Sequence, residues 1–126
     1  MPPIGPLASS PIITRHPANP VLAAADVPYL ATLVFNAGLC KFGGQYVMVF
    51  RNDYGPAGEE KLTGTNIGLA TSADGVTWRV DPKPCFELAD AEITRAYDPR
   101  LTVVDGRVYM CFAVDTRHGL RGLFAA

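Results

Sequence analysis

A carboxylate and an amide stand at matching places in this chain and could do chemistry together. Asn36 and Asp98 lie 62 residues apart, and each follows an aromatic residue at the start of a predicted strand. Polar side chains at the ends of inner strands can converge on one axis, where they would hydrogen-bond to a hydroxyl-rich ligand such as a sugar. The alternative interpretation is that both residues cap turns, because Gly38 and Pro99 follow them closely.

Arg100 bears on what Asp98 could do. In an extended strand these two side chains point to the same face. A guanidinium there would keep the carboxylate charged, whereas a general acid must carry a proton at the working pH. The spacing therefore favours an ion pair between Asp98 and Arg100, unless Arg100 turns toward an anion and leaves Asp98 to a substrate.

A second charged pair ends an apolar run. Arg51 shares one face of its predicted strand with Val47 and Val49. An arginine on an apolar strand face needs a partner, and Asp53 lies two residues on, on the same face if the strand continues. The two side chains could form a structural pair, or their donors and acceptors could bind sugar hydroxyls.

No metal or nucleotide site is indicated. His16 and His118 are isolated, and Cys40, Cys85 and Cys111 show no CxxC spacing. The sequence contains no GxSxG, no HExxH and no glycine-rich phosphate loop before a helix. We therefore expect neither a metal nor a cofactor.

The composition is that of one folded domain. The chain has 126 residues, of which 48% are hydrophobic and 18% charged, which argues against a disordered chain. A net charge of -1 excludes a basic surface for nucleic acid, and no apolar run approaches the roughly 18 residues of a membrane span. The first residues lack the features of a secretory signal and the cysteines suit a reducing compartment, so we expect a cytoplasmic protein.

Short strands joined by turns must position these residues. Residues 1–30 are rich in proline and predict an extended N-terminal arm without a regular helix. Strands of one antiparallel sheet are expected at 33–37, 46–51, 66–71 and 77–80. Turns are expected at Gly43-Gly44 and, in the segment from Ser72 to Trp78, at Asp74-Gly75. The run 46–51 is apolar on both alternating faces, which predicts an inner strand covered on both sides.

The pattern then begins again at a constant offset. Residues 44–50 match 106–112, and Asp53 matches Asp115, both at the 62-residue offset of Asn36 and Asp98. Gly68-Leu69 are expected to recur as Gly122-Leu123, at an offset of 54. A repeat of four short strands is typical of a propeller blade.

We therefore predict an all-β fold with about one and a half blades of a β-propeller. The first blade spans 31–82, and 83–126 contains a linker and an incomplete second blade. Because each blade buries its faces against its neighbours, we expect the chain to be a piece of a longer protein, inactive alone. The alternative is a complete β-sandwich of about seven strands.

Five segments together resemble the N-terminal part of glycoside hydrolase family 130, over about residues 11–126. They are Arg15–Leu22 (RHPANPVL), Val34–Gly38 (VFNAG), Tyr46–Arg51 (YVMVFR), Ser72–Gly75 (SADG) and Tyr97–Arg100 (YDPR). The resemblance implies a five-bladed β-propeller that cleaves β-1,4-mannosides by inverting phosphorolysis to α-mannose 1-phosphate, with inorganic phosphate as co-substrate. It implies that Asp98 is the acid, acting through a sugar hydroxyl, and that Asn36, Arg51 and Asp53 contact the mannosyl unit. We also expect Arg100 to bind the substrate.

Two other functions remain open at this stage. A β-mannoside hydrolase of the same fold would need a second carboxylate as base, and a non-catalytic carbohydrate-binding β-module would need none. The expected partners are a β-mannoside oligosaccharide and phosphate, without nucleic acid or membrane, and a homo-oligomer is compatible with the sequence. The sequence leaves the acceptor sugar open.

Overall fold

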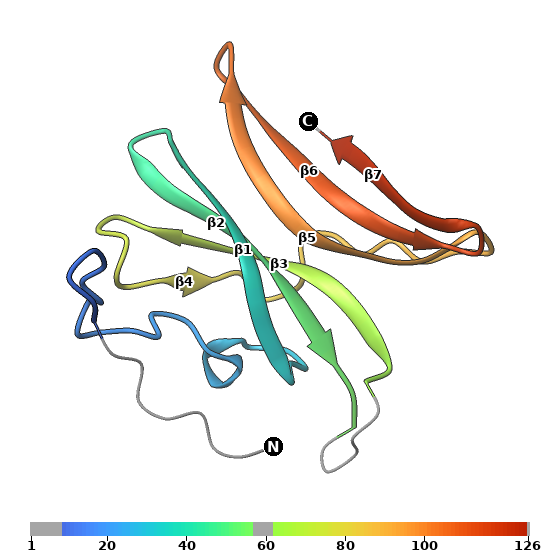
Figure 1. The fold of residues 1–126 in the computed structure, drawn as a ribbon, viewed down its shortest axis with the longest axis horizontal. Coiled ribbons are helices and arrows are strands. Elements are labelled where there is room, and N and C mark those ends of the chain that lie inside the picture. Colours follow the sequence, from blue (N-terminus) through green and yellow to red (C-terminus); the bar gives the residue numbers. More distant parts are fainter. Residues whose placement is uncertain (1–8, 57–61, 126) are drawn as a thin grey trace.

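The computed structural model describes residues 9–56 and 62–125, and these form two antiparallel sheets (Figure 1). The first sheet has the order β1 (Leu33–Phe42), β2 (Gln45–Tyr54), β3 (Gly64–Ser72) and β4 (Arg79–Val80). The second has the order β5 (Ile93–Val104), β6 (Arg107–Thr116) and β7 (Gly119–Ala125). The predicted all-β fold is confirmed, with one four-stranded blade and an incomplete second one.

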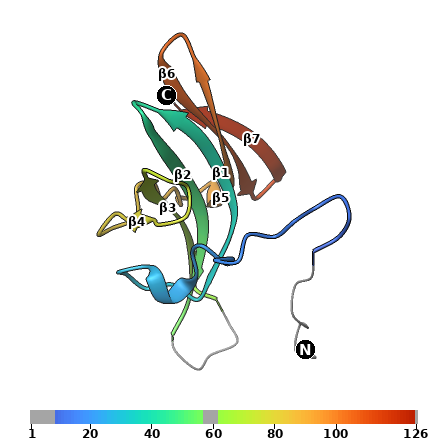
Figure 2. The same ribbon diagram turned by 90° about the vertical axis from the view of Figure 1, so that its left-hand side faces the viewer.

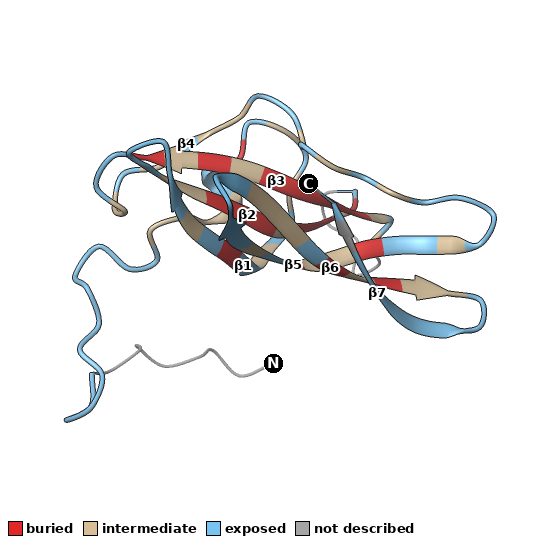
Figure 3. Cartoon of the chain, turned by 90° about the horizontal axis from the view of Figure 1, so that it is seen from above, coloured by how far each residue is buried: buried red, intermediate tan, exposed pale blue. Residues whose placement is uncertain are grey.

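The predicted inner strand is covered on both faces. Val49 of β2 packs with Ile67 of β3 against the second sheet, where Phe112 is also buried. Phe50, one residue on, faces the other way and packs near the N-terminal segment. The buried positions follow the middle of the sheets, whereas the hairpin tips of the second sheet are exposed (Figure 3). Alternation along one apolar run therefore creates two cores.

The N-terminal arm differs from its prediction at its inner end. Residues 1–8 lie outside the described residues. Beyond them the chain runs without regular structure to a single 3-10 turn, η1 (Ala24–Asp26), which departs from a purely extended path (Figure 2). Val27 follows the turn and is buried against the first sheet. The end of the arm is thus a cover for that sheet.

The repeat places an irregularity at the same point of the first strand of each sheet, β1 and β5. The pairing of β1 with β2 shifts between Phe35 and Gly38, and that of β5 with β6 shifts between Tyr97 and Arg100. The residues inside the two bulges, Asn36 and Asp98, have φ of 49° and 53°. Asparagine and aspartate tolerate this left-handed region better than other residues with a side chain.

One part of the predicted repeat is wrong. Gly68 pairs with Phe50, but Gly122 pairs with Ala113, which stands where the first sheet has Arg51. Because Arg51 pairs with Ile67, the counterpart of Gly122 is Ile67 rather than Gly68. The same dipeptide can occur twice by chance, whereas the pairing register shows which residues of the two sheets occupy equivalent positions.

The two sheets approach closely at Gly38. A Cβ added there would lie 2.7 Å from the Arg100 Cα and 2.7 Å from the Pro99 carbonyl oxygen, both backbone atoms of β5. We expect Gly38→Ala to force β1 and β5 apart and to lower the free energy of unfolding by about 1–3 kcal/mol. Urea unfolding of the purified protein measures this, with Gly122→Ala as control, since among the described residues nothing lies within 4 Å of that added Cβ. Equal stability of the two variants would contradict the close approach.

The turn after β3 is built by side-chain hydrogen bonds, as predicted. Asp74 Oδ1 accepts the backbone N–H groups of Thr77 and Val76, each at 2.8 Å, and the Ser72 hydroxyl at 2.9 Å. These bonds, that of Thr77 first, lower the pKa of Asp74 from 3.8 to about 2. The segment is structural, in agreement with its turn chemistry.

This turn should make stability depend on pH in a defined window. Because the Asp74 pKa is lower in the folded state, the carboxylate stabilises the fold above pH 3.8, and that contribution is lost as the pH falls through about 2. In Asp74→Asn this part of the stability–pH curve should flatten, as measured by urea midpoints at several pH values. The exposed Asp105→Asn variant should keep the native slope. If the stability–pH curve of Asp74→Asn ran parallel to the native one, the Asp74 carboxylate would not be the source of this pH dependence.

Candidate functional site

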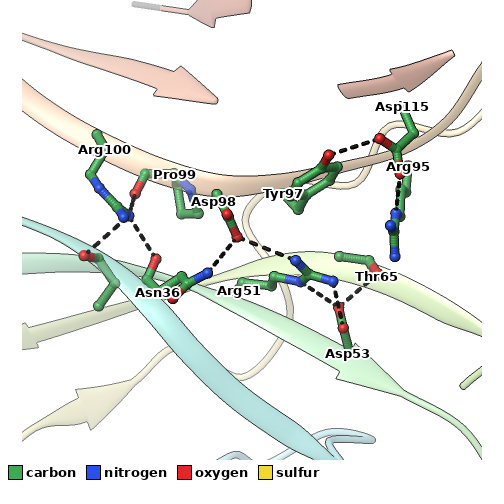
Figure 4. Close-up of polar contacts among 11 residues, drawn as sticks. Asn36, Arg51, Asp53, Thr65, Arg95, Tyr97, Asp98, Pro99, Arg100 and Asp115 are labelled. Carbon is green, nitrogen blue, oxygen red and sulfur yellow. Dashed lines mark hydrogen bonds and ion pairs between the residues drawn. The ribbon is translucent and has the colours of Figure 1, made fainter. Parts of the chain in front are cut away.

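The two bulges bring Asn36 and Asp98 into contact. Asn36 Nδ2 donates a hydrogen bond to Asp98 Oδ1 at 2.9 Å, from β1 to β5 (Figure 4). The expected convergence of these residues is therefore observed, and they do not cap turns, because both lie within strands. A bulge turns a side chain away from the regular alternation of its strand, and in this way the Asn36 and Asp98 side chains reach the space between β1 and β5.

Arg51 connects Asp98 to a second carboxylate. It donates from Nε to Asp53 Oδ1 at 2.8 Å, from Nη2 to Asp53 Oδ2 at 2.7 Å, and from Nη1 to Asp98 Oδ1 at 3.3 Å. Asp53 Oδ1 also accepts the Thr65 hydroxyl at 2.7 Å. The hydrogen bond to Asp53 is the main reason that the pKa of Arg51 is raised, against the opposing effect of burial. The predicted Arg51–Asp53 pair is present, and Arg51 additionally reaches Asp98.

The expected ion pair between Asp98 and Arg100 is not formed. Arg100 Nη1 instead donates to the backbone carbonyls of Pro99 at 2.8 Å and Asn36 at 3.0 Å. The same-face argument fails because the bulge at Asp98 interrupts the alternation of the strand. Arg100 thus holds β1 and β5 together in this structure, and its role in substrate binding stays a prediction.

Two aromatic rings and a further charged cluster were not predicted as site residues. The Arg51 guanidinium carbon lies 4.6 Å from the Phe35 ring centre and 4.8 Å from that of Tyr97. The Tyr97 hydroxyl donates to Asp115 Oδ1 at 2.7 Å, and Arg95 Nε donates to Asp115 Oδ2 at 2.6 Å. The repeat contained a signal for the rings, since Phe35 and Tyr97 precede Asn36 and Asp98.

These contacts define the electrostatics of the second blade's side of the site. Burial, followed by the hydrogen bond to Asp115, raises the pKa of Tyr97. The Tyr97 hydrogen bond, followed by that of Arg95, lowers the pKa of Asp115. Asp115 is therefore a charged acceptor that orients the Tyr97 hydroxyl.

Asp98 is the carboxylate best placed for chemistry. Its side chain is 34% exposed, against 5% for that of Asp53. The Asp115 side chain is 31% exposed, but both of its oxygens accept hydrogen bonds. Within residues 9–56 and 62–125, both donors to Asp98 bind Oδ1, so Oδ2 is available to a ligand. A carboxyl group with one oxygen held and the other accessible can exchange a proton with a bound hydroxyl.

A metal centre finds no support in the described part of the chain. No group of three or more histidine, cysteine, aspartate or glutamate side chains there is arranged to hold a metal ion. The candidate site is instead a set of hydrogen-bonding and charged side chains, which suits a hydroxyl-rich ligand. Among the same residues, no helix is long and apolar enough to cross a membrane.

Comparisons with known proteins match this fold. The profile of the family described as beta-1,4-mannooligosaccharide phosphorylase matches residues 11–125. No curated protein matches the chain significantly. Among solved structures, a glycosyl hydrolase from Bacteroides ovatus is 23% identical over 88% of this chain and 36% of its own, with a TM-score of 0.71. A putative glycoside hydrolase from Parabacteroides distasonis is 22% identical over 88% and 37%, with a TM-score of 0.72.

A third structure is similar to the same extent. It is 22% identical over 88% of this chain and 36% of its own, with a TM-score of 0.73. Its description states that the GH130 family of mannoside phosphorylases contains glycoside hydrolases that target beta-1,2 mannosidic linkages in Candida mannan. The chain therefore spans little more than a third of the length of these structures.

The fold and these matches define a class, the five-bladed β-propellers of the family that contains mannoside phosphorylases and glycoside hydrolases. The chain belongs to glycoside hydrolase family 130. Its two sheets are one complete blade and part of a second blade of that propeller.

Proposed function

We propose that the protein containing this chain cleaves β-1,4-mannosides by inverting phosphorolysis and releases α-mannose 1-phosphate. The observation that carries the proposal is the contact of Asp98 in the second blade with Asn36 and Arg51 in the first blade. Phosphorolysis needs one carboxylic acid, because phosphate replaces the water that a base would activate in an inverting hydrolase. Among the carboxylates of the site, Asp98 has one oxygen without a donor from the described residues, whereas both oxygens of Asp53 and of Asp115 accept hydrogen bonds.

The roles of the individual residues follow from their contacts. Asp98 would be the acid, with Oδ1 held by Asn36 and Arg51 and Oδ2 free to meet a sugar hydroxyl that relays the proton to the leaving oxygen. Asn36, exposed beside Asp98, offers an amide to the mannosyl unit, and Arg51 and Asp53 would bind its hydroxyls. Arg100 is proposed as a substrate contact at the edge of the site.

Asp53 is poorly suited to act as the base of a hydrolase. Both of its oxygens accept hydrogen bonds from Arg51, and Oδ1 also accepts one from Thr65. A carboxylate whose oxygens are all engaged in this way offers no free oxygen to orient an attacking water. This favours phosphorolysis among the described residues.

Hydrolysis is the second candidate. One similar structure is described in terms of GH130 hydrolases that act on beta-1,2 mannosidic linkages. A hydrolase would need a second carboxylate about 6.5–9.5 Å from Asp98, with room for a water between them. Both oxygens of Asp53 and of Asp115 are engaged in hydrogen bonds, so we expect such a base to come from another part of the complete protein.

The test uses the complete gene product with β-1,4-mannobiose, mannosylglucose and a β-1,2-mannobiose, each with and without inorganic phosphate. Mannose 1-phosphate that forms only with phosphate supports the proposal, and the ranking of substrates identifies the acceptor sugar. Free mannose formed at the same rate without phosphate would overturn it in favour of hydrolysis. No turnover of any mannoside would favour a carbohydrate-binding module.

A further inference from the structure

We propose that Phe35 and Tyr97 are positioning residues that hold the Arg51 guanidinium between the two blades so that it binds both Asp53 and Asp98. The expected effect on kcat rests on the proposed function, whereas the position of the Arg51 guanidinium can be tested without it. The Arg51 guanidinium carbon lies 4.6 Å from one ring centre and 4.8 Å from the other, with one ring from each blade. Both distances are within the range of attractive cation–π contacts.

The contact between Arg51 and Asp98 needs such support. Two hydrogen bonds of 2.7 and 2.8 Å fix one edge of the guanidinium to Asp53. A single longer bond of 3.3 Å joins Nη1 to Asp98, whose side chain is 34% exposed. Partly exposed ion pairs are weak alone. Rotation about the edge held by Asp53 would move Nη1 away from Asp98, and the packed rings limit that movement.

Tyr97 is itself fixed from the second blade. Its hydroxyl donates to Asp115 at 2.7 Å, and Arg95 binds the other oxygen of Asp115 at 2.6 Å. The second blade has Ala113 where the first has Arg51, as the strand register shows. It therefore contributes a ring to Arg51 and has no arginine at the equivalent position, although Arg95 of the second blade also lies 4.9 Å from the centre of the Tyr97 ring.

The repeat explains why one ring comes from each blade. Phe35 and Tyr97 occupy the position just before the bulge residue of β1 and of β5. Asn36 and Asp98 contact each other from the two bulges, and the ring that precedes each of them lies against the Arg51 guanidinium. The aromatic residues thus serve the polar site by holding Arg51, and they act through it.

The experiment compares Tyr97→Leu, Tyr97→Phe and Phe35→Leu in the complete gene product. A misplacement of about 1 Å in an active site can cost about 100-fold in rate. We expect Tyr97→Leu and Phe35→Leu to lower kcat by about 30- to 100-fold, with a smaller change in KM. Tyr97→Phe keeps the ring and should keep kcat within about threefold, although it loses the bond to Asp115.

A matched control is available on the same strand as Arg51. Tyr46 makes a ring contact with Lys41, whose Nζ lies 5.2 Å from the ring centre, at the far end of β2. Tyr46→Leu should leave kcat unchanged. If Tyr97→Phe loses as much activity as Tyr97→Leu, or if Tyr97→Leu retains activity, the positioning role is overturned.

Crystal structures of the variants separate this proposal from the proposed function. In Tyr97→Leu the Arg51 guanidinium should remain on Asp53 and leave Asp98. If the protein turns over no mannoside but this displacement is seen, the positioning role holds and the proposed function fails. If Arg51 keeps both carboxylates in Tyr97→Leu, the positioning role fails whatever the activity.

Discussion

Asp98→Asn should reduce kcat of the complete gene product on its mannoside substrate by about 100- to 10,000-fold, the usual range for loss of a general acid. The variant should fold normally for two reasons. Asparagine tolerates the φ of 53° at this position. Its amide oxygen can also still accept the bonds that Asn36 and Arg51 donate to Oδ1. Steady-state kinetics with phosphate present measure the effect, and the thermal midpoint reports the fold.

Asp105→Asn is the matched control for this prediction. Asp105 also has a positive φ, of 49°, and lies in the exposed turn between β5 and β6. Its replacement removes a carboxylate at the same kind of backbone position, and it should leave kcat unchanged. If the protein were a binding module without catalysis, Asp98→Asn would change its affinity for the ligand by no more than the contribution of one hydrogen bond. Retained turnover in Asp98→Asn would therefore exclude Asp98 as the acid.

Arg51→Met should cause the largest loss of stability of any single replacement in the site. The Arg51 and Asp53 side chains are 12% and 5% exposed, and the change leaves the Asp53 charge buried with only the Thr65 hydroxyl as a side-chain partner among the described residues. Removing one partner of a buried ion pair costs about 3–5 kcal/mol. Urea unfolding measures the loss, and adding Asp53→Leu should recover part of it, because the unpaired charge is then gone.

Arg95→Met provides the comparison, since Arg95 also pairs with an aspartate, which in this case lies on the neighbouring strand. That pair is 44% and 31% exposed, so its loss should cost less than about 1 kcal/mol. Similar losses for the two arginine variants would show that burial does not govern the Arg51 pair.

The fold could be predicted where local patterns determine it. The glycine turn at Gly43-Gly44 and the doubly apolar run at 46–51 gave the correct hairpin and the correct inner strand. The 62-residue repeat gave the second sheet. The third strand of that sheet was matched by composition and came out one position wrong, because register depends on cross-strand pairing.

The site was harder to predict because its contacts join residues that are far apart in the sequence. The Arg51–Asp53 pair follows from strand alternation and is present. The Arg51–Asp98 contact joins residues 47 positions apart, and no local rule places them together. The Asp98–Arg100 pair failed for a local reason, since alternation does not hold across a bulge. The roles assigned to these residues stay predictions until the variants are measured.

The pairing of Asn36 with Asp98 also says something about how a duplicated unit acquires a function. Two identical units would place either two carboxylates or two amides at this contact. Two carboxylates would repel each other, and two amides would have no acid. At this contact the two copies therefore differ by exchange of an oxygen for a nitrogen. The reciprocal variant Asn36→Asp with Asp98→Asn would keep the shape of the contact and move its charge to the first blade.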